Sequence, residues 1–332
     1  MILVTGAAGF IGYHVCHHLL SKGEQVIGVD NLNPYYDVKL KEARLAKLTP
    51  HPRFNFHLVD IANQTAIQAL IQQHPNITHI VHLAAQAGVR YSLKNPFAYT
   101  DSNIVGHLTL LEACRHLPRL KHFVYASSSS VYGANQKLPF SVLDPVDQPI
   151  SLYAATKRSC ELMSYTYSHL FGIPSTGLRF FTVYGPWGRP DMSAFLFTKA
   201  ILEEEEIPVF NHGDMRRNFT YIDDITQGIL ACVESPPSSL TSDVSQTDAS
   251  PPHRIYNIGN SRSEPLMHFI YTLEEITGKK AKIRYEDMQP GDVKETVADI
   301  SDTTRDFGFI PKTNIETGLA HFVEWYREFY GI

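Results

Sequence analysis

The feature that most constrains the fold of this chain is a set of three evenly spaced glycines close to its start. Gly6, Gly9 and Gly12 follow a short apolar run, Ile2-Leu3-Val4, and a segment with helical periodicity comes after them. Glycines allow a sharp turn, a close approach of the backbone to a ligand and close packing of a helix on a strand. This order of strand, turn and helix therefore indicates a dinucleotide-binding fold, with a purely structural glycine turn as the alternative.

The start of the helix and the end of the next strand favour a bound dinucleotide. Free backbone N–H groups at Phe10 and Ile11, in the first helical turn, are suited to a pyrophosphate. The next expected strand, 25–29, ends at Asp30, 18 residues after Gly12. A carboxylate there accepts hydrogen bonds from the adenosine ribose and repels a 2′-phosphate, which predicts NAD as the cofactor rather than NADP.

Strands and helices continue to alternate after this unit. Strands are expected at 55–59, 79–83, 122–126 and 175–181, and helices at 63–73 and 97–116. The alternation predicts an α/β protein with a Rossmann-type doubly wound parallel sheet. Asp60 and Ile61, after the third strand, and Ala84, after the fourth, are expected near the cofactor. Asp60 is placed either to meet the adenine amino group or to cap the following helix.

A tyrosine and a lysine lie four positions apart in a later helical segment. Tyr153 and Lys157 therefore share a face of the expected helix. A lysine ammonium near a phenol favours the phenolate, so the tyrosine can serve as a general base. Tyr35 and Lys39 repeat the spacing without supporting motifs, so spacing alone does not decide between catalysis and an ordinary helix surface.

A cluster of serines supplies the missing context. Residues 127–130 are all serine and follow the expected strand 122–126 at its carboxyl end, where ligands bind in such sheets. A serine hydroxyl there can hydrogen-bond a substrate hydroxyl and share its proton with Tyr153. A polar loop that caps the next helix is the alternative.

The regular alternation weakens after residue 181. We expect a first domain over 1–181 and a smaller C-terminal α/β substrate-binding lobe over 182–332, with some segments returning to the first domain. Arg189, in a loop rich in Gly and Pro, is either aimed at an anionic substrate group or solvated, and Arg216 with Arg217 can hold a diphosphate. Further elements are expected as a helix at 195–204, a strand at 208–210, an exposed loop at 235–252 and a final helix at 316–330.

Composition excludes several classes of partner. The 332 residues carry a net charge of -5 with scattered positive residues, so we expect no nucleic acid. Apolar stretches fall short of the roughly 20 residues that cross a bilayer, so we expect a cytoplasmic protein without membrane contact. Cys16, Cys114, Cys160 and Cys232 occupy separate apolar helical segments and are expected as buried thiols. No metal site is expected, because the histidines at 14, 17 and 18 lack an accompanying carboxylate.

Taken together, these motifs carry a family resemblance. The glycine turn, Asp30, Asp60, the serine strand end and the pair Tyr153 and Lys157 resemble the extended short-chain dehydrogenase/reductases that act on nucleotide sugars. Four longer stretches are similar to the UDP-glucuronate 4-epimerases of that family, at 30–37, 86–92, 185–192 and 219–224. Two departures are Asn218, where the family usually has Asp, and the loop 235–252, which is longer than usual.

The resemblance implies a specific reaction. It implies 4-epimerisation of UDP-glucuronate through a 4-keto sugar, in which NAD stays bound. Tyr153 would move the proton of the C4 hydroxyl, Lys157 would assist it and hold the nicotinamide ribose, and Ser128 would hydrogen-bond the C4 oxygen. Arg217 would contact the uridine diphosphate. The sugar carboxylate would be held by Ser129, Ser130, Thr182 and Arg189.

Three alternatives stay open. Dehydratases and decarboxylases of the family carry an acid within the serine strand end, where this chain has only residues 127–130. An epimerase for UDP-glucose and UDP-galactose is the nearer competitor, and it has no need of the Arg189 loop. A non-catalytic NAD-binding scaffold would need neither Tyr153 nor Ser128. The apolar helices at 97–116 and 154–171 further predict a homodimer that pairs them as a bundle.

Overall fold

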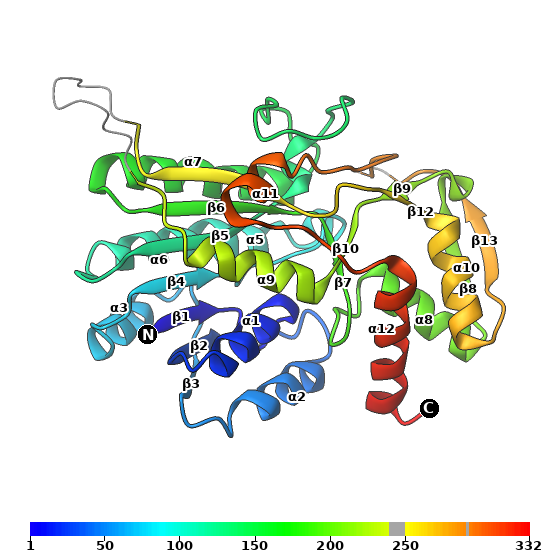
Figure 1. The fold of residues 1–332 in the computed structure, drawn as a ribbon, viewed down its shortest axis with the longest axis horizontal. Coiled ribbons are helices and arrows are strands. Elements are labelled where there is room, and N and C mark those ends of the chain that lie inside the picture. The colour runs from blue at the N-terminus through cyan, green and yellow to red at the C-terminus, as the bar shows by residue number, and fades with distance from the viewer. Residues whose placement is uncertain (239–249, 290–291) are drawn as a thin grey trace.

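A seven-stranded parallel sheet forms the centre of the molecule (Figure 1). The computed structural model describes residues 1–238, 250–289 and 292–332. In spatial order the strands are β11 (His253–Ile258), β6 (Ser175–Phe180), β5 (His122–Ser128), β4 (His79–His82), β1 (Ile2–Thr5), β2 (Val26–Asp30) and β3 (Phe54–Leu58). The direction of winding reverses between β1 and β4, so a crevice opens there at the carboxyl ends of the strands. The predicted doubly wound parallel sheet is confirmed.

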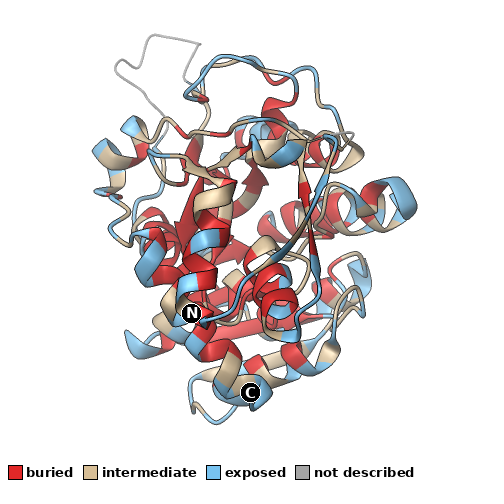
Figure 2. Cartoon of the chain, turned by 90° about the vertical axis from the view of Figure 1, so that its right-hand side faces the viewer, coloured by how far each residue is buried: buried red, intermediate tan, exposed pale blue. Residues whose placement is uncertain are grey.

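Helices cover both faces of this sheet (Figure 1). One layer consists of α1 (Phe10–Ser21), α2 (Val38–Leu48), α9 (Ile222–Val233) and α11 (Ser301–Phe307). The other consists of α3 (Gln64–Gln73), α6 (Gly106–Cys114) and α7 (Leu152–Phe171). Because both faces are covered, β1, β2 and β6 are buried along their whole length, and buried residues gather in the central strands in Figure 2.

The single helix expected at 97–116 is wrong, because this region is divided. It contains α4 (Tyr91–Lys94), α5 (Pro96–Tyr99), a π-helical segment η1 (Thr100–Val105) and then α6. The π-helical turn carries Asn103, which is buried and accepts from the Gln86 N–H at 2.9 Å. The Asn103 amide also donates to the Gln86 carbonyl and the Thr156 hydroxyl, each at 3.0 Å. A buried side chain with these three partners accounts for the departure from regular α-helix.

The second lobe contains small sheets and three helices. Its strand pairs are β7 (Thr182–Tyr184) with β10 (Phe219–Tyr221), β8 (Glu206–Phe210) with β13 (Lys282–Glu286), and β9 (Arg216–Arg217) with β12 (Glu264–Pro265). The helices are α8 (Ser193–Glu203), α10 (Leu266–Thr277) and α12 (Ile315–Tyr330), and the short 3-10 turns of the chain are η2 (Ser129–Tyr132) and η3 (Asn211–Gly213). The chain returns from this lobe to the main sheet through α9, β11 and α11.

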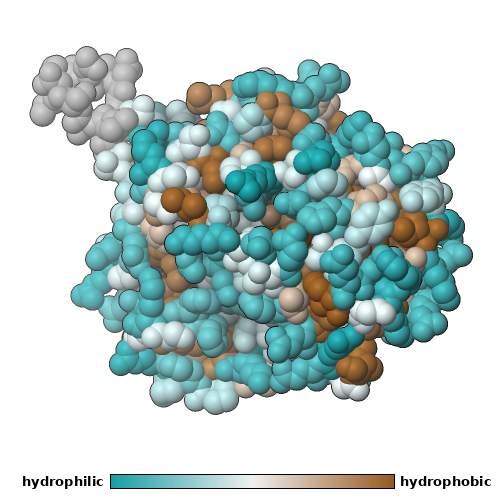
Figure 3. All heavy atoms as spheres, turned by 45° about the vertical axis from the view of Figure 1, so that its right-hand side comes forward, coloured by the Kyte–Doolittle hydropathy of each residue, from teal (hydrophilic) through white to brown (hydrophobic). Residues whose placement is uncertain are grey.

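The cysteines, the length of the helices, the surface and the loop 235–252 were each the subject of an expectation from the sequence. All four cysteines are buried free thiols, as predicted, and burial raises the pKa of Cys160 to about 11. Within the described ranges no helix combines the length and the apolar character needed to span a bilayer. The face in Figure 3 is mainly hydrophilic, with scattered hydrophobic side chains. Of the expected exposed loop at 235–252, residues 239–249 lie outside the described residues.

Candidate active site

A cavity of about 520 Å³ lies at the carboxyl ends of the central strands. Its wall includes every predicted site residue except Asp60 and Arg216. From the predicted cofactor set it includes Gly6, Gly9, Phe10, Ile11, Gly12, Asp30, Ile61 and Ala84. From the predicted catalytic and substrate sets it includes Tyr153, Lys157, Ser128, Ser129, Ser130, Thr182, Arg189 and Arg217. The structure therefore brings residues that are far apart in the sequence to one continuous cavity.

The glycine turn at this cavity requires glycine for steric reasons. Gly6 has a φ of +73°, and a Cβ added to it would lie 2.8 Å from the Ala84 nitrogen. A Cβ at Gly12 would lie 2.0 Å from the Gly6 carbonyl oxygen. Gly9 caps α1 without a side-chain hydrogen bond, so the N–H groups of the first turn of α1 can be met by a ligand. These features fit a dinucleotide pyrophosphate.

Asp30 ends β2 at the same side of the cavity. Its buried carboxylate accepts from the backbone N–H groups of Ala8 at 3.1 Å and Leu32 at 2.8 Å. These bonds fix the carboxylate beside the glycine turn, where it fits the ribose hydroxyls of the dinucleotide. Lys41, which the sequence did not single out, lies with its Nζ 3.9 Å from Asp30 Oδ1. Burial lowers the pKa of Lys41, while Asp30 opposes that shift.

Asp60 is exposed, follows the end of β3 by two residues and is not part of the cavity wall. Its carboxylate accepts from the Asn31 amide at 2.9 Å and from the Ala62 N–H at 2.8 Å. The helix-cap alternative is wrong, because Asn63 caps α3 by accepting from the Ala66 N–H at 3.0 Å. A contact between Asp60 and the adenine stays a prediction.

The Tyr153 and Lys157 pair lies in the first turns of α7. Ser151 caps this helix by accepting from the Ala154 N–H at 3.1 Å. Lys157 is buried, and its ammonium donates to the Ala126 carbonyl of β5 at 3.0 Å, which ties the helix to the strand that carries the serines. The half-buried Tyr153 ring meets Tyr99 edge-on, with 6.0 Å between ring centres.

The competing pair, Tyr35 and Lys39, has a different geometry. Helix α2 begins at Val38, after an Asp37 cap, so Tyr35 precedes the helix and the two side chains do not share a helical face. Lys39 is exposed. Tyr35 and Lys39 therefore have the same spacing as Tyr153 and Lys157, but only the latter two lie on one face of a helix.

The serines form a compact turn at the end of β5. Ser128 is buried, accepts from the Ser130 N–H at 3.2 Å and donates to the Ser130 hydroxyl at 3.1 Å. Ser129 and Ser130 begin η2 and remain partly exposed to the cavity. Thr182, at the start of β7, lies on the same wall. Several hydroxyls therefore face the space beside Tyr153.

Arg189 is oriented by a partner that the sequence interpretation missed. Its guanidinium forms a two-point ion pair with Asp191, at 3.0 Å through Nε and 2.6 Å through Nη2. Asp191 also accepts from the Tyr35 hydroxyl at 3.0 Å. Burial raises and Arg189 lowers the pKa of Asp191, and the net effect is a lowered pKa. Asp191 lies only two positions after Arg189, so their short spacing is a local signal for this ion pair, whereas the Tyr35 contact spans 156 residues and has none.

Arg217 lies at the lobe side of the cavity. Its Nη1 donates to the carbonyls of Arg216 at 3.0 Å and Lys294 at 3.1 Å. Burial lowers the pKa of Arg217, and nearby Asp292 opposes that shift. The neighbouring Asn218 is buried, and its amide donates to the carbonyls of Asn260 and Arg262, which an ionised Asp could not do.

The fold and this cavity define an α/β enzyme of the dinucleotide-binding class. The chain belongs to the NAD dependent epimerase/dehydratase family, whose model matches residues 2–259. The family resemblance drawn from the motifs is thereby confirmed, and so is NAD as the cofactor.

Individual proteins match over the full length of the chain. It is 50% identical to Protein CapI of Staphylococcus aureus, over 99% of both chains. It is 46% identical to UDP-glucuronate 4-epimerase 2 of Arabidopsis thaliana, over 99% of this chain and 76% of that protein. Among solved structures, the UDP-glucuronic acid 4-epimerase of Bacillus cereus, in complex with UDP-glucuronic acid and NAD, has a TM-score of 0.88 and 36% identity, and the match covers 99% of both chains.

Proposed function

We propose that this protein is an NAD-dependent nucleotide-sugar 4-epimerase that converts UDP-glucuronate to UDP-galacturonate. The proposal rests on the composition of one cavity wall, in which Tyr153 occurs together with Thr182, Arg189 and the serines at 128–130. These groups match a sugar with both a hydroxyl to be oxidised and a carboxylate to be bound. The similarity to the Arabidopsis and Bacillus cereus enzymes supports the same substrate.

The residues of the cavity suit the proton transfers of this reaction. Tyr153 takes the proton of the sugar C4 hydroxyl and later returns it, and Lys157 lies one helical turn further along the same face of α7. Ser128 hydrogen-bonds the C4 oxygen. NAD, which the glycine turn and Asp30 would hold, would supply a hydride acceptor for C4 and a hydride donor for the 4-keto sugar. Arg217 contacts the uridine diphosphate, and Asp60 meets the adenine.

The carboxylate of the substrate requires additional control. A 4-keto uronic acid is a β-keto acid, and it loses carbon dioxide when the carboxylate stands perpendicular to the carbonyl plane. Ser129, Ser130, Thr182 and Arg189 hold the carboxylate away from that orientation. Their hydroxyl and guanidinium donors are all suited to carboxylate oxygens, and all four residues line the cavity wall.

One observation favours the neutral-sugar alternative. Asp191 already pairs with Arg189 and partly balances its charge. A cavity with a balanced arginine accepts the neutral sugars UDP-glucose and UDP-galactose more readily than one with an isolated arginine. The UDP-glucose 4-epimerase activity is therefore the second candidate.

A single experiment separates these candidates. The purified protein, without added NAD, is incubated with UDP-glucuronate and separately with UDP-glucose, and the anomeric signals are followed by NMR. We expect UDP-galacturonate to appear from UDP-glucuronate. Epimerisation of UDP-glucose alone would overturn the substrate assignment, and the absence of any reaction with added NAD would favour a non-catalytic NAD-binding scaffold.

We also propose that the protein is a homodimer and that it is cytoplasmic. Large apolar side chains on the helices expected at the interface are exposed in the single chain, with Phe97 75% and Leu170 62% accessible. Pairing these helices with a second copy would remove apolar surface from water. Light scattering at micromolar concentration tests the dimer, because a monomer under these conditions would contradict it.

A further inference from the structure

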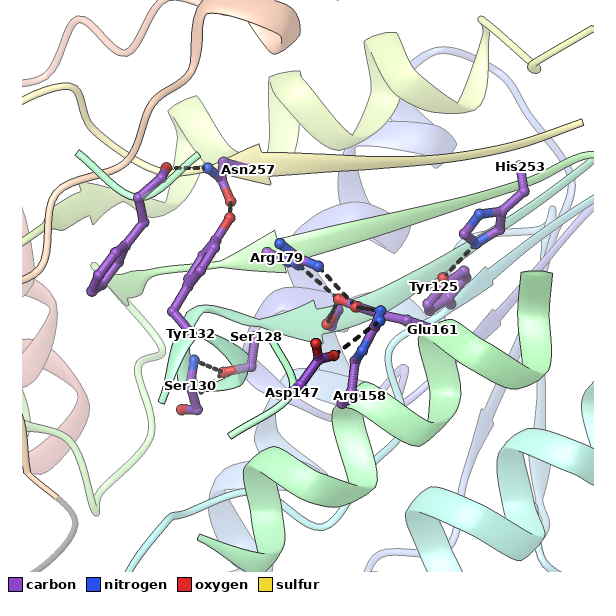
Figure 4. Close-up of polar contacts among 12 residues, drawn as sticks. Tyr125, Ser128, Ser130, Tyr132, Asp147, Arg158, Glu161, Arg179, His253 and Asn257 are labelled. Atoms are coloured by element: carbon purple, nitrogen blue, oxygen red, sulfur yellow. Dashed lines mark hydrogen bonds and ion pairs between the residues drawn. The ribbon is translucent and has the colours of Figure 1, made fainter. Parts of the chain in front are cut away.

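A buried ion pair lies close to residues 128–130, here called the serine turn, and it is not part of the proposed catalytic set. Glu161 is 1% and Arg179 is 2% exposed as side chains. Arg179 donates to Glu161 through Nε at 2.8 Å and through Nη2 at 2.9 Å, a two-point geometry (Figure 4). Burial raises and Arg179 lowers the pKa of Glu161, and the net effect is a lowered pKa. Glu161 is therefore a fixed negative charge inside the protein.

This ion pair connects the catalytic helix to the residue before the serine turn. Glu161 follows Lys157 by one helical turn on α7, and both side chains reach β5. Lys157 donates to the Ala126 carbonyl at 3.0 Å. The Ser127 hydroxyl donates to Glu161 Oε1 at 2.6 Å. Two successive residues of β5 are therefore tied to two successive turns of α7, immediately before Ser128.

The same ion pair also contacts Tyr132, which lies two residues after the serine turn. The Arg179 guanidinium carbon lies 4.9 Å from the centre of the Tyr132 ring. Tyr132 ends η2, and its hydroxyl donates to Asn257 Oδ1 at 2.6 Å (Figure 4). Within the described residues Arg179 Nη1 has no hydrogen-bond partner, so the ring face provides a compensating cation–π contact.

The Glu161–Arg179 ion pair therefore contacts the chain on both sides of residues 128–130, at Ser127 and at Tyr132. We propose that Glu161 and Arg179 are positioning residues, which keep the serine turn in a fixed place relative to Tyr153 and thereby return the 4-keto sugar to the epimer before it loses carbon dioxide. This inference rests on the proposed epimerisation of UDP-glucuronate. It concerns residues that touch neither the substrate nor the cofactor.

The loss of carbon dioxide is the reaction that reports on this positioning. The bond between C5 and the carboxylate breaks, and its electron pair forms an enolate with the C4 carbonyl. A proton then adds at C5, the product is a UDP-4-keto-pentose, and the hydride taken from C4 remains on the cofactor. A displaced serine turn releases the carboxylate from its hydroxyl partners, so this product increases relative to UDP-galacturonate.

Ser127→Ala is the sharpest test. Replacement of Glu161 itself takes away the ion-pair partner of the buried Arg179 guanidinium, which endangers folding. Ser127→Ala removes the hydrogen bond between β5 and Glu161 and leaves the Glu161–Arg179 ion pair in place. The matched control is Ser164→Ala, because Ser164 is also a buried serine, lies on α7 and bonds His107 at 2.8 Å, away from the serine turn.

The measurement is the ratio of UDP-4-keto-pentose to UDP-galacturonate after a fixed turnover, by NMR and mass spectrometry. We expect Ser127→Ala to raise the ratio about tenfold and Ser164→Ala to leave it at the wild-type value, although each variant loses one buried side-chain hydrogen bond. Equal ratios in the two variants would overturn the positioning role. Failure of the wild-type protein to epimerise UDP-glucuronate would instead overturn the proposed function.

Discussion

At the scale of single residues, the site depends on how each polar group is held. Lys157 is fixed by the Ala126 carbonyl, and Arg189 is fixed by Asp191. Tyr153 has its ring against Tyr99. In the proposed function, Tyr153 exchanges a proton with the sugar and Arg189 discriminates substrates by charge.

Tyr153→Phe tests the first of these roles. The variant keeps the ring and its contact with Tyr99 but removes the hydroxyl that moves the proton, so kcat should fall about 10²–10⁴-fold. The thermal midpoint should stay within the wild-type error. Tyr165→Phe, on an exposed part of the same helix, is the control and should retain full activity. A variant at position 153 with normal kcat would exclude this tyrosine as the base.

Arg189→Ala tests the second role. A charge-assisted hydrogen bond to the sugar carboxylate is worth about 1.5–3 kcal/mol, so KM for UDP-glucuronate should rise about 10–100-fold. Binding of UDP-glucose, which has no carboxylate, should change by much less in the same variant. If affinity for UDP-glucuronate and the share of decarboxylated sugar both stay at wild-type values, Arg189 does not bind the carboxylate.

At the scale of elements, the sequence predicts the features that are set by neighbouring residues, and it fails where the interacting residues are far apart in the chain. The glycine turn and the Ser151 cap of α7 are set by neighbours in the chain, so their residue types predict them. The π-helical turn η1 is set by bonds from Asn103 to Gln86 and Thr156, which are 17 and 53 residues away. No local periodicity encodes such partners, and the region was therefore mistaken for a continuous helix.

Asn103→Ala tests whether these bonds stabilise η1. The substitution leaves buried groups of Gln86 and Thr156 without their partner, and each such group costs about 1–3 kcal/mol. We expect the free energy of unfolding, measured with denaturant, to fall by about 2–4 kcal/mol. The control is Asp101→Ala, which changes an exposed residue of the same π-helical segment and should have little effect. Equal losses in the two variants would contradict the assignment.

At the scale of the whole molecule, buried histidines link stability to pH. Burial lowers the pKa of His14 and His107 to about 3 and that of His122 and His253 to about 4. The unfolded chain returns these groups to their ordinary value near 6.5, so below that pH it binds protons that the folded protein does not. The stability that these neutral, buried histidines contribute is therefore fully present above about pH 6.5, and it is lost as the pH falls toward 4.

Each such histidine changes the free energy of unfolding by up to about 1.4 kcal/mol per pH unit. Over two pH units the four histidines together therefore lower it by an amount comparable to the stability of a whole domain. Denaturant unfolding at a series of pH values should therefore give a steep loss below pH 6.5. His122→Gln retains a hydrogen-bonding side chain toward Val233 and Thr176. In this variant unfolding should take up about one proton fewer, so the slope of the unfolding free energy against pH should be smaller. His169→Gln changes an exposed residue of α7 and should leave the slope unchanged. A flat profile between pH 6.5 and 5 in the wild-type protein would contradict this linkage.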